Sequence, residues 1–487
     1  MSSAKHLSKF LTVKNMNPNV IKAEYAVRGI MSQTASKIRE DLAAGTGDYP
    51  FDEIVECNIG NPQALGQKPI SFYREVLAGC INKDLINTNL LPEGVKSRVK
   101  YYNKMIQGDM GAYSESPGYG FAREAVAAFI EKRDGGIKSN KNNIILTDGA
   151  SSGIETCFQA ILSSSNEGVM IPIPQYPLYT ALISLFGVNE VPYFLDEPSG
   201  WQITPEALQR SYDEAAAKGV KPRLIVIINP GNPTGQILTE ETIKKIVEFA
   251  YRNGVVIMAD EVYQQNIYRE DRSFVSFKKV VASMPEPYNN TELISFHSTS
   301  KGILGECGAR GGYFEWFNLD PEVEAQIHKL KTIRLCSNTY GQLLTDLMVR
   351  PPTDAENGRE VTDKFKKETS ALFTSLKRRS KIVHETLNRM KGVTCNEIEG
   401  SMYAFPRIHL SKKAIQEARS QGMEPDLFYT LEALKATGIC TVQGSGFRQA
   451  PDTYHFRITT LVTPDEKLER KMESFRQFND KFMDKYA

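Results

Sequence analysis

The sequence predicts an α/β protein whose central sheet is mostly parallel. Three short apolar runs, at 224–228, 255–259 and 293–296, have the uninterrupted hydrophobicity of strands buried on both faces. Helical patterns alternate with these and other strand-like runs, and such alternation is typical of βαβ units. The expected fold class is therefore a large α/β domain with a mostly parallel central sheet, accompanied by a smaller α+β domain.

The spacing of apolar residues and the residues that cap helices indicate the remaining elements. The helix expected over 239–252 has Thr239 as its N-cap and glutamates in its first turn, as stable helix starts do. The other predicted strands are 143–147, 168–172 and 190–195, and the other predicted helices include 27–42, 123–133, 153–162 and 178–186.

The length of 487 residues is too great for one simple core and predicts two substantial domains. Beyond Pro351-Pro352 the pattern changes to a long charged helix and shorter elements. We expect an N-terminal arm and part of a small domain over 1–93, a large domain over 94–350, and a C-terminal small domain over 351–487.

Composition excludes several classes of partner. With 59 basic and 58 acidic residues the net charge is +1, which gives no electrostatic case for nucleic acid or an anionic membrane. No apolar run reaches the length of a membrane span. Seven scattered cysteines without a C-x-x-C pair, and no histidine cluster, predict neither disulfides nor a metal site. We expect a cytoplasmic protein, although an acid-free, lysine-bearing start (residues 1–23) leaves a mitochondrial location open.

Polar segments follow five of the predicted strands, at 148–152, 174–176, 229–235, 260–263 and 298–301. In parallel sheets ligands bind beyond the carboxyl ends of the strands. These segments are therefore expected to form one site.

Lys301 is the expected centre of that site. A lysine can form a Schiff base with an aldehyde, and here it follows a strand and a cluster of small hydroxyl residues. Asp260 is expected to pair with a ring nitrogen, and Tyr263 to bond a phenolic oxygen of the same ring. Read singly, Asp260 is equally well a turn or N-cap aspartate, and Tyr263 a core tyrosine.

A phosphate cradle is expected beside Lys301. Ala150 and Ser151 lie in the segment 148–153 that joins a predicted strand to a predicted helix, and the N–H groups at a helix start bind anions. A plainly capped helix is the structural alternative. Ser298, Ser300 and Arg310 lie close to Lys301 in sequence and complete the cradle. A lysine-bound aldehyde and a phosphate together indicate pyridoxal 5′-phosphate (PLP) as the cofactor.

Three further residues are expected to contact the ring or the substrate. Tyr176 is placed to stack on the ring, and Asn232, in Asn229–Gly235, to donate to its phenolic oxygen. Arg457 is expected to bind a substrate carboxylate with both arms of its guanidinium. Loop packing, turn formation and a solvent-facing arginine are the respective structural alternatives.

Jointly, these residues resemble the fold-type I PLP enzymes of the aspartate aminotransferase superfamily, over nearly the whole chain from about residue 15. Within it, alanine aminotransferases are the most similar branch. The stretches that carry this resemblance are 24–29, 57–63, 146–151, 172–179 and 305–313.

The resemblance implies a homodimer with shared active sites. Tyr113 matches a tyrosine that reaches the partner's phosphate, and Gly60 and Asn61 match an arm that closes over substrate. Gln443 and Arg448 lie in a segment where many relatives have Pro-Gly-Ser, which leaves the substrate preference open.

The implied reaction moves the amino group of L-alanine to 2-oxoglutarate, giving pyruvate and L-glutamate by ping-pong kinetics. Lys301 would be the Schiff-base lysine and then the proton shuttle. The alternatives are a glutamate:glyoxylate aminotransferase, a PLP-dependent lyase, and a catalytically inactive binding module of the same fold.

Overall fold

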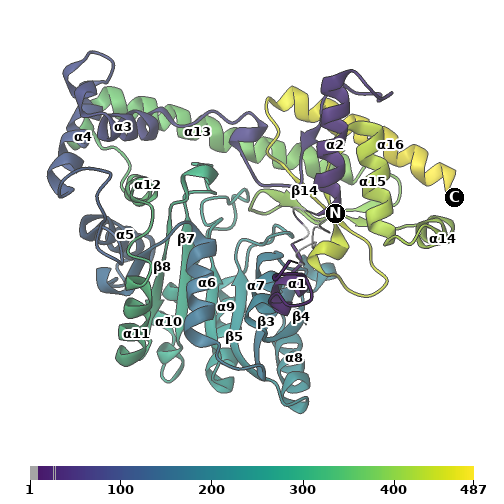
Figure 1. Cartoon of the computed structure of the whole chain (residues 1–487), viewed down its shortest axis with the longest axis horizontal. Helices are drawn as coiled ribbons and strands as arrows, with labels where there is room; N and C mark the ends of the chain where they lie inside the picture. The colour runs from purple at the N-terminus through teal and green to yellow at the C-terminus, as the bar shows by residue number, and fades with distance from the viewer. Residues whose placement is uncertain (1–8, 26, 28) are drawn as a thin grey trace, which may run out of the picture.

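The computed structural model describes residues 9–487 except 26 and 28. Residues 1–8 of the expected N-terminal arm, with Ala26 and Arg28 of the stretch 24–29, lie outside the described residues. Figure 1 shows a helix-covered sheet in the lower half, and a smaller set of strands and helices at the upper right. One long helix, α13, runs across the top from α3 and α4 at the upper left toward the strands and helices at the upper right.

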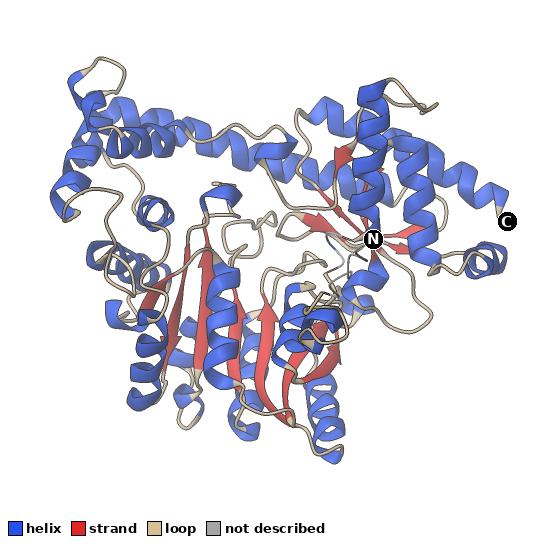
Figure 2. Ribbon diagram, in the orientation of Figure 1, coloured by secondary structure: helices blue, strands red, loops and turns tan. Residues whose placement is uncertain are grey.

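The central sheet has seven strands in the order β2-β8-β7-β6-β5-β3-β4. β8 runs antiparallel to both of its neighbours, and the other adjacent pairs are parallel, which confirms the predicted fold class. Figure 2 shows the strands as one twisted layer between helices. The strand bounds are β2 Ile144–Leu146, β3 Glu167–Ile173, β4 Asn189–Phe194, β5 Lys221–Ile228, β6 Val256–Asp260, β7 Leu293–Ser298 and β8 Gly312–Phe317.

Two apolar layers bury the faces of this sheet. One packs side chains of α8, α9 and α10 against it, and the other packs α6, α7 and α11. Complete burial of these valine, leucine and isoleucine side chains contributes about 1.5–3 kcal/mol each. The covering helices are α5 Gly120–Arg133, α6 Ala150–Ile161, α7 Leu178–Phe186, α8 Pro205–Ala217, α9 Glu240–Asn253, α10 Phe277–Ser283 and α11 Pro321–Thr332.

The C-terminal part forms its own core around short strands. β14 lies between β10 and β13, β11 pairs with β9, and β1 from the N-terminal region pairs with β12. Its strands are β1 Val55–Glu56, β9 Val393–Thr394, β10 Tyr403–Ala404, β11 Arg407–Ile408, β12 Ile439–Cys440, β13 Val442–Gln443 and β14 Phe456–Thr459. Its helices are α13 Asp354–Leu387, kinked at Gly358, α14 Lys412–Ser420, α15 Pro425–Thr437 and α16 Asp465–Lys485.

The N-terminal region divides its packing between the two parts. Helix α2 (Ile30–Ala44) packs on α15, whereas α3 (Ser71–Ile81) and α4 (Glu93–Met105) share a core with α5 and α12 (Thr339–Val349). The short α1 (Pro18–Lys22) contacts α7. The three-part division of the chain at residues 93 and 350 stays a prediction.

Short 3-10 helices lie between the longer elements. They are η2 Gln63–Leu65, η3 Lys83–Asn87, η4 Lys141–Asn143, η5 Glu197–Ser199, η6 Tyr288–Asn290, η7 Cys307–Ala309 and η8 Gly444–Phe447.

Local sequence signals produce several of these boundaries. Thr239 caps α9 by accepting the N–H of Thr242, as predicted.

Over the described ranges, no helix combines the length and apolarity of a membrane span, and no group of metal-binding side chains converges.

Candidate functional site

Lys301 lies in the turn after β7, at the carboxyl end of the sheet. Its Nζ donates to the carbonyl oxygen of Gly60 at 2.9 Å, so the N-terminal region lies directly over the lysine. Gly60 allows this approach because it lacks a Cβ, which would lie 2.1 Å from the hydroxyl of Tyr403 and 3.2 Å from Lys301 Nζ. Asn61 follows in the same turn, where its N–H donates to the carbonyl of Ile59.

Asp260 is buried at the end of β6, the strand that pairs with β7. One carboxylate oxygen, Oδ2, accepts the hydroxyl of Tyr179 at 2.8 Å. The other, Oδ1, is buried and accepts no hydrogen bond from the described residues. Burial raises the pKa of the Asp260 carboxyl to about 6, against the opposing effects of Tyr179, the Val262 N–H and the charge of Lys301. The neighbouring Glu261 is directed elsewhere, since it accepts the N–H of Phe277 at 2.9 Å.

A buried polar cluster joins the large sheet to the C-terminal part. Asn232 Nδ2 donates to the Tyr263 hydroxyl at 3.5 Å, and Tyr263 donates to the Tyr403 hydroxyl at 3.4 Å. Arg457 donates to Asn232 Oδ1 at 3.0 Å and to the carbonyl of Asn58. Chain segments separated by 140 and 225 positions of sequence therefore meet around one small volume.

Arg457 is 1% exposed, and its guanidinium lies over two aromatic rings, 4.2 Å from the centre of Tyr403 and 4.6 Å from that of Phe447. Its Nε is buried without a partner among the described residues. Burial alone would raise the pKa of the Tyr403 phenol, but the charges of Lys301 and Arg457 hold it below its ordinary value. A buried cation with an unused donor is suited to an anionic ligand.

The predicted phosphate cradle is assembled at the start of α6. Arg310 donates to the Ser151 hydroxyl at 3.2 Å, the Ser300 hydroxyl at 3.4 Å and the carbonyl of Asp148 at 3.0 Å. Ala150 is the first residue of α6 and follows Gly149, where an added Cβ would lie 2.5 Å from the Arg310 guanidinium. Ser298 is the last residue of β7, and its hydroxyl already accepts the N–H of Ser300 and donates to the carbonyl of Gly311.

Tyr176 lies beside the polar cluster, close to Tyr403 and Arg457, whereas Tyr113 makes no hydrogen bond to the site residues in the described part of the chain. The hydroxyls of Tyr176 and Tyr25 are 2.7 Å apart, and the two rings meet edge to face. Tyr113 lies in the loop between α4 and α5 with 76% of its surface exposed. Gln443 and Arg448 are outside the polar cluster, and Arg448 instead pairs with Glu190 at 3.4 Å.

Sequence reasoning missed three residues of the site: Tyr25, Tyr179 and Tyr403. Tyr179 was detectable in principle, because it lies at the start of α7 within the stretch 172–179 that carries the resemblance. No local signal distinguishes Tyr403, which reaches Tyr263 across 140 positions of sequence.

The residues present fit PLP. The unpartnered Asp260 Oδ1 is the acceptor that a protonated ring nitrogen requires, Lys301 supplies an amine, and Arg310 with the start of α6 supplies anion donors. Fold and site together define a PLP-dependent enzyme of the α/β class.

Comparison with known proteins gives the family. Residues 81–475 match the model of the aminotransferase class I and II family. The chain belongs to this family, and it is a PLP-dependent aminotransferase that acts on small molecules.

Curated relatives cover the chain almost from end to end. A probable mitochondrial alanine aminotransferase of Dictyostelium discoideum is 45% identical over 98% of this chain and 90% of its own length. Alanine aminotransferase 1 of Bos taurus is 44% identical over 98% of this chain and 96% of its own. Among solved structures, an alanine aminotransferase of Pyrococcus furiosus matches 96% of this chain and 99% of its own with a TM-score of 0.75 at 23% identity, which shows the common fold.

Proposed function

We propose that the protein transfers the amino group of L-alanine to 2-oxoglutarate, producing pyruvate and L-glutamate. The observation that carries this proposal is the convergence of Lys301, the unpartnered Asp260 oxygen and the buried Arg457 at one end of the sheet. The curated relatives at 44–45% identity, which bear the name alanine aminotransferase, support the choice of amino donor.

Each residue of the site has a distinct task in this proposal. Arg457 binds the substrate carboxylate, and its anchoring on Asn232 fixes the orientation of the bound molecule. Bound PLP supplies a conjugated ring that delocalises the negative charge left when a proton leaves the substrate Cα. Asp260 keeps the ring nitrogen protonated, which strengthens that delocalisation.

Lys301 Nζ is the group that moves the proton. Its amine would anchor the cofactor, and as a free amine it would take the proton from the substrate Cα as a base and later give a proton back as an acid. In this proposal Tyr263 and Asn232 would bond the ring oxygen, and Tyr176 would pack on the ring. The phosphate would be held by Arg310, Ser151, Ser300, Ser298 and the Ala150 end of α6. Gly60 and Asn61 cover the bound substrate.

A panel of amino donors tests the proposal. The enzyme should use alanine with 2-oxoglutarate, and Lys301→Ala should lose turnover while keeping its fold by circular dichroism. A preference for glyoxylate as acceptor would favour the glutamate:glyoxylate alternative. Pyruvate release from an amino acid without any keto acid would indicate a lyase. Retained turnover in Lys301→Ala would contradict the assigned role.

The active form is proposed to be a homodimer in which Tyr113 completes the partner's phosphate site. Tyr113 is exposed, as are the apolar side chains of Ile333, Leu335 and Tyr340. The hydroxyl of Thr339 donates to the carbonyl of Met110, which joins the two exposed segments, and an exposed apolar surface of this kind supports a subunit interface. Mixing Lys301→Ala with Tyr113→Ala subunits tests this arrangement. Each hybrid dimer then contains one site with both residues intact, so activity should reappear on mixing, whereas independent sites would give no recovery.

The proposed location is cytoplasmic, with a mitochondrial location as the alternative. Three relatives, one from Dictyostelium discoideum and two from Arabidopsis thaliana, carry mitochondrial in their names. Microscopy of the chain fused at its C-terminus to a fluorescent protein distinguishes the two.

A further inference from the structure

We infer that Glu399 is a positioning residue. It fixes the distance between the loop that carries Asn232 and the segment that carries Tyr403. Neither the family motifs nor the site chemistry points to this glutamate. A changed KM can be interpreted only if the proposed function is correct, so this part of the inference rests on that function. The spectroscopic test requires only that PLP binds.

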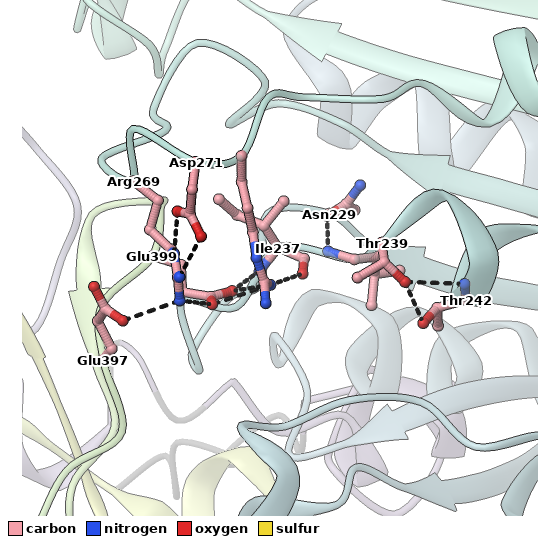
Figure 3. Close-up of polar contacts among 10 residues, drawn as sticks. Asn229, Ile237, Thr239, Thr242, Arg269, Asp271, Glu397 and Glu399 are labelled. Atoms are coloured by element: carbon pink, nitrogen blue, oxygen red, sulfur yellow. Dashed lines mark hydrogen bonds and ion pairs between the residues drawn. The ribbon is translucent and has the colours of Figure 1, made fainter.

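The carboxylate of Glu399 is nearly buried and receives donors from two other chain segments. Its Oε2 accepts the backbone N–H of Ile237 at 2.8 Å. Arg272 donates to the same carboxylate at 3.0–3.1 Å, and Arg269 donates to its Oε1 at 3.1 Å. Figure 3 shows Glu399 between Arg269 and the segment at Ile237.

The peptide units flanking Ile237 are held from both sides. While Glu399 accepts the N–H, Arg272 donates to the carbonyl oxygen of Ile237 at 3.3 Å. Because the donor and the acceptor of one residue are both bound, this point of the chain cannot rotate without breaking one of the contacts.

Ile237 ends a closed loop that carries Asn232. The Asn229 side chain accepts the N–H of Leu238 at 3.0 Å and so closes the loop. Inside it, the N–H of Gly231 donates to the carbonyl of Gln236 at 2.9 Å. A shift at one end is therefore transmitted to Asn232 as a shift of the whole loop.

The other end of the connection carries Tyr403. The N–H of Gly400 donates to the carbonyl of Gly235 at 2.9 Å, and that of Ser401 to the carbonyl of Asn266 at 3.0 Å. Glu399 thus supplies the side-chain link, and Gly400 the backbone link, between the Asn232 loop and the Tyr403 segment. Loss of the side-chain link leaves one direct hydrogen bond to hold their spacing.

The consequence reaches the substrate clamp and the cofactor. Asn232 contacts Arg457 at 3.0 Å and Tyr263 at 3.5 Å, and Tyr263 contacts Tyr403. Displacement of the loop should weaken binding of the substrate carboxylate and change the hydrogen bonds offered to the cofactor.

The experiment compares three changes at Glu399 with one at Glu397. Glu399→Gln keeps an acceptor of the right length, Glu399→Asp keeps the charge but retracts the oxygen from the Ile237 N–H, and Glu399→Ala removes both. Glu397→Ala is the matched control, because Glu397 binds Arg269 at 3.1 Å from the exposed side.

We expect Glu399→Ala and Glu399→Asp to raise KM for the amino donor about tenfold. The midpoint pH at which the absorbance of bound PLP changes should shift by roughly half a unit. Glu399→Gln should restore most of both values, and Glu397→Ala should match the wild type.

Three results would overturn the inference. One is a Glu399→Ala variant that loses thermal stability without a change in KM or in the absorbance titration. Another is a Glu399→Gln variant as impaired as Glu399→Asp. If Glu399→Ala does not fold, a Glu399→Asp variant with the KM and the absorbance titration of the wild type would refute the inference. The titration needs no substrate, so a wrong amino donor in the proposed function would leave this arm of the test intact.

Discussion

Replacing Asp260 by asparagine should change how the stability of the cofactor-free protein depends on pH. Burial raises the pKa of this carboxyl from 3.8 to about 6. Between those pH values the folded protein binds the proton more tightly than the unfolded chain does. Stability therefore falls as the pH rises through this window and is constant above it. A pKa raised by about 2 corresponds to about 3 kcal/mol of destabilisation at pH 8, about half of which remains at pH 5.

The asparagine introduced by Asp260→Asn does not titrate, so this penalty is absent from the variant. The free energy of unfolding of Asp260→Asn minus that of the wild type should grow by about 1–2 kcal/mol between pH 5 and pH 8. Urea unfolding followed by tryptophan fluorescence measures it, because Trp201 and Trp316 both pack in the cores of the large sheet. Glu261, whose pKa burial raises to about 7, is present in both proteins and cancels.

A difference that is flat with pH, or one that favours the wild type as the pH rises, would refute the reasoning. Asp213→Asn, at an exposed position on α8, serves as the control and should give a flat difference. With PLP bound the preference should reverse, because the ring nitrogen gives the carboxylate a positive partner. Turnover of Asp260→Asn should then fall about 10²- to 10³-fold.

Substitutions at three more residues test the site. Gly60→Ala should lower kcat/KM at least about tenfold with little change in the circular dichroism spectrum. The reason is that the new Cβ would lie 2.1 Å from the Tyr403 hydroxyl. Unchanged kinetics would show that the N-terminal region moves freely. Arg457→Lys should lower kcat/KM about 10- to 100-fold, mainly by raising KM, since an ammonium cannot bind a carboxylate bidentately. A change confined to kcat would argue against a role of Arg457 in carboxylate binding. Tyr25→Phe, which removes the hydroxyl that is 2.7 Å from that of Tyr176, should change KM by only about threefold, while Tyr25→Ala should admit longer amino donors. A donor panel on which Tyr25→Ala matches the wild type would exclude a role in specificity.

Local signals were sufficient for much of the large sheet. The apolar run 224–228 lies in β5, the helix predicted over 178–186 coincides with α7, and Thr239 caps α9 as its position indicates. Hydrophobic period and cap chemistry act over a few residues, so one sequence window contains the whole cause. Strand β8 was not predicted, since its antiparallel place between β2 and β7 depends on partners that are distant in sequence.

The sequence by itself determined the fold class, the family resemblance, and a lysine, an aspartate and an arginine that the structure brings to one end of the sheet. Only the tertiary structure decided which side chains surround them. Tyr403 meets Tyr263, and Glu399 meets Ile237, across 140 and 162 positions of sequence. Such contacts follow from how segments that are distant in sequence pack together. No periodicity within either segment encodes that packing, because each segment is compatible with its own local structure whether or not the other is present.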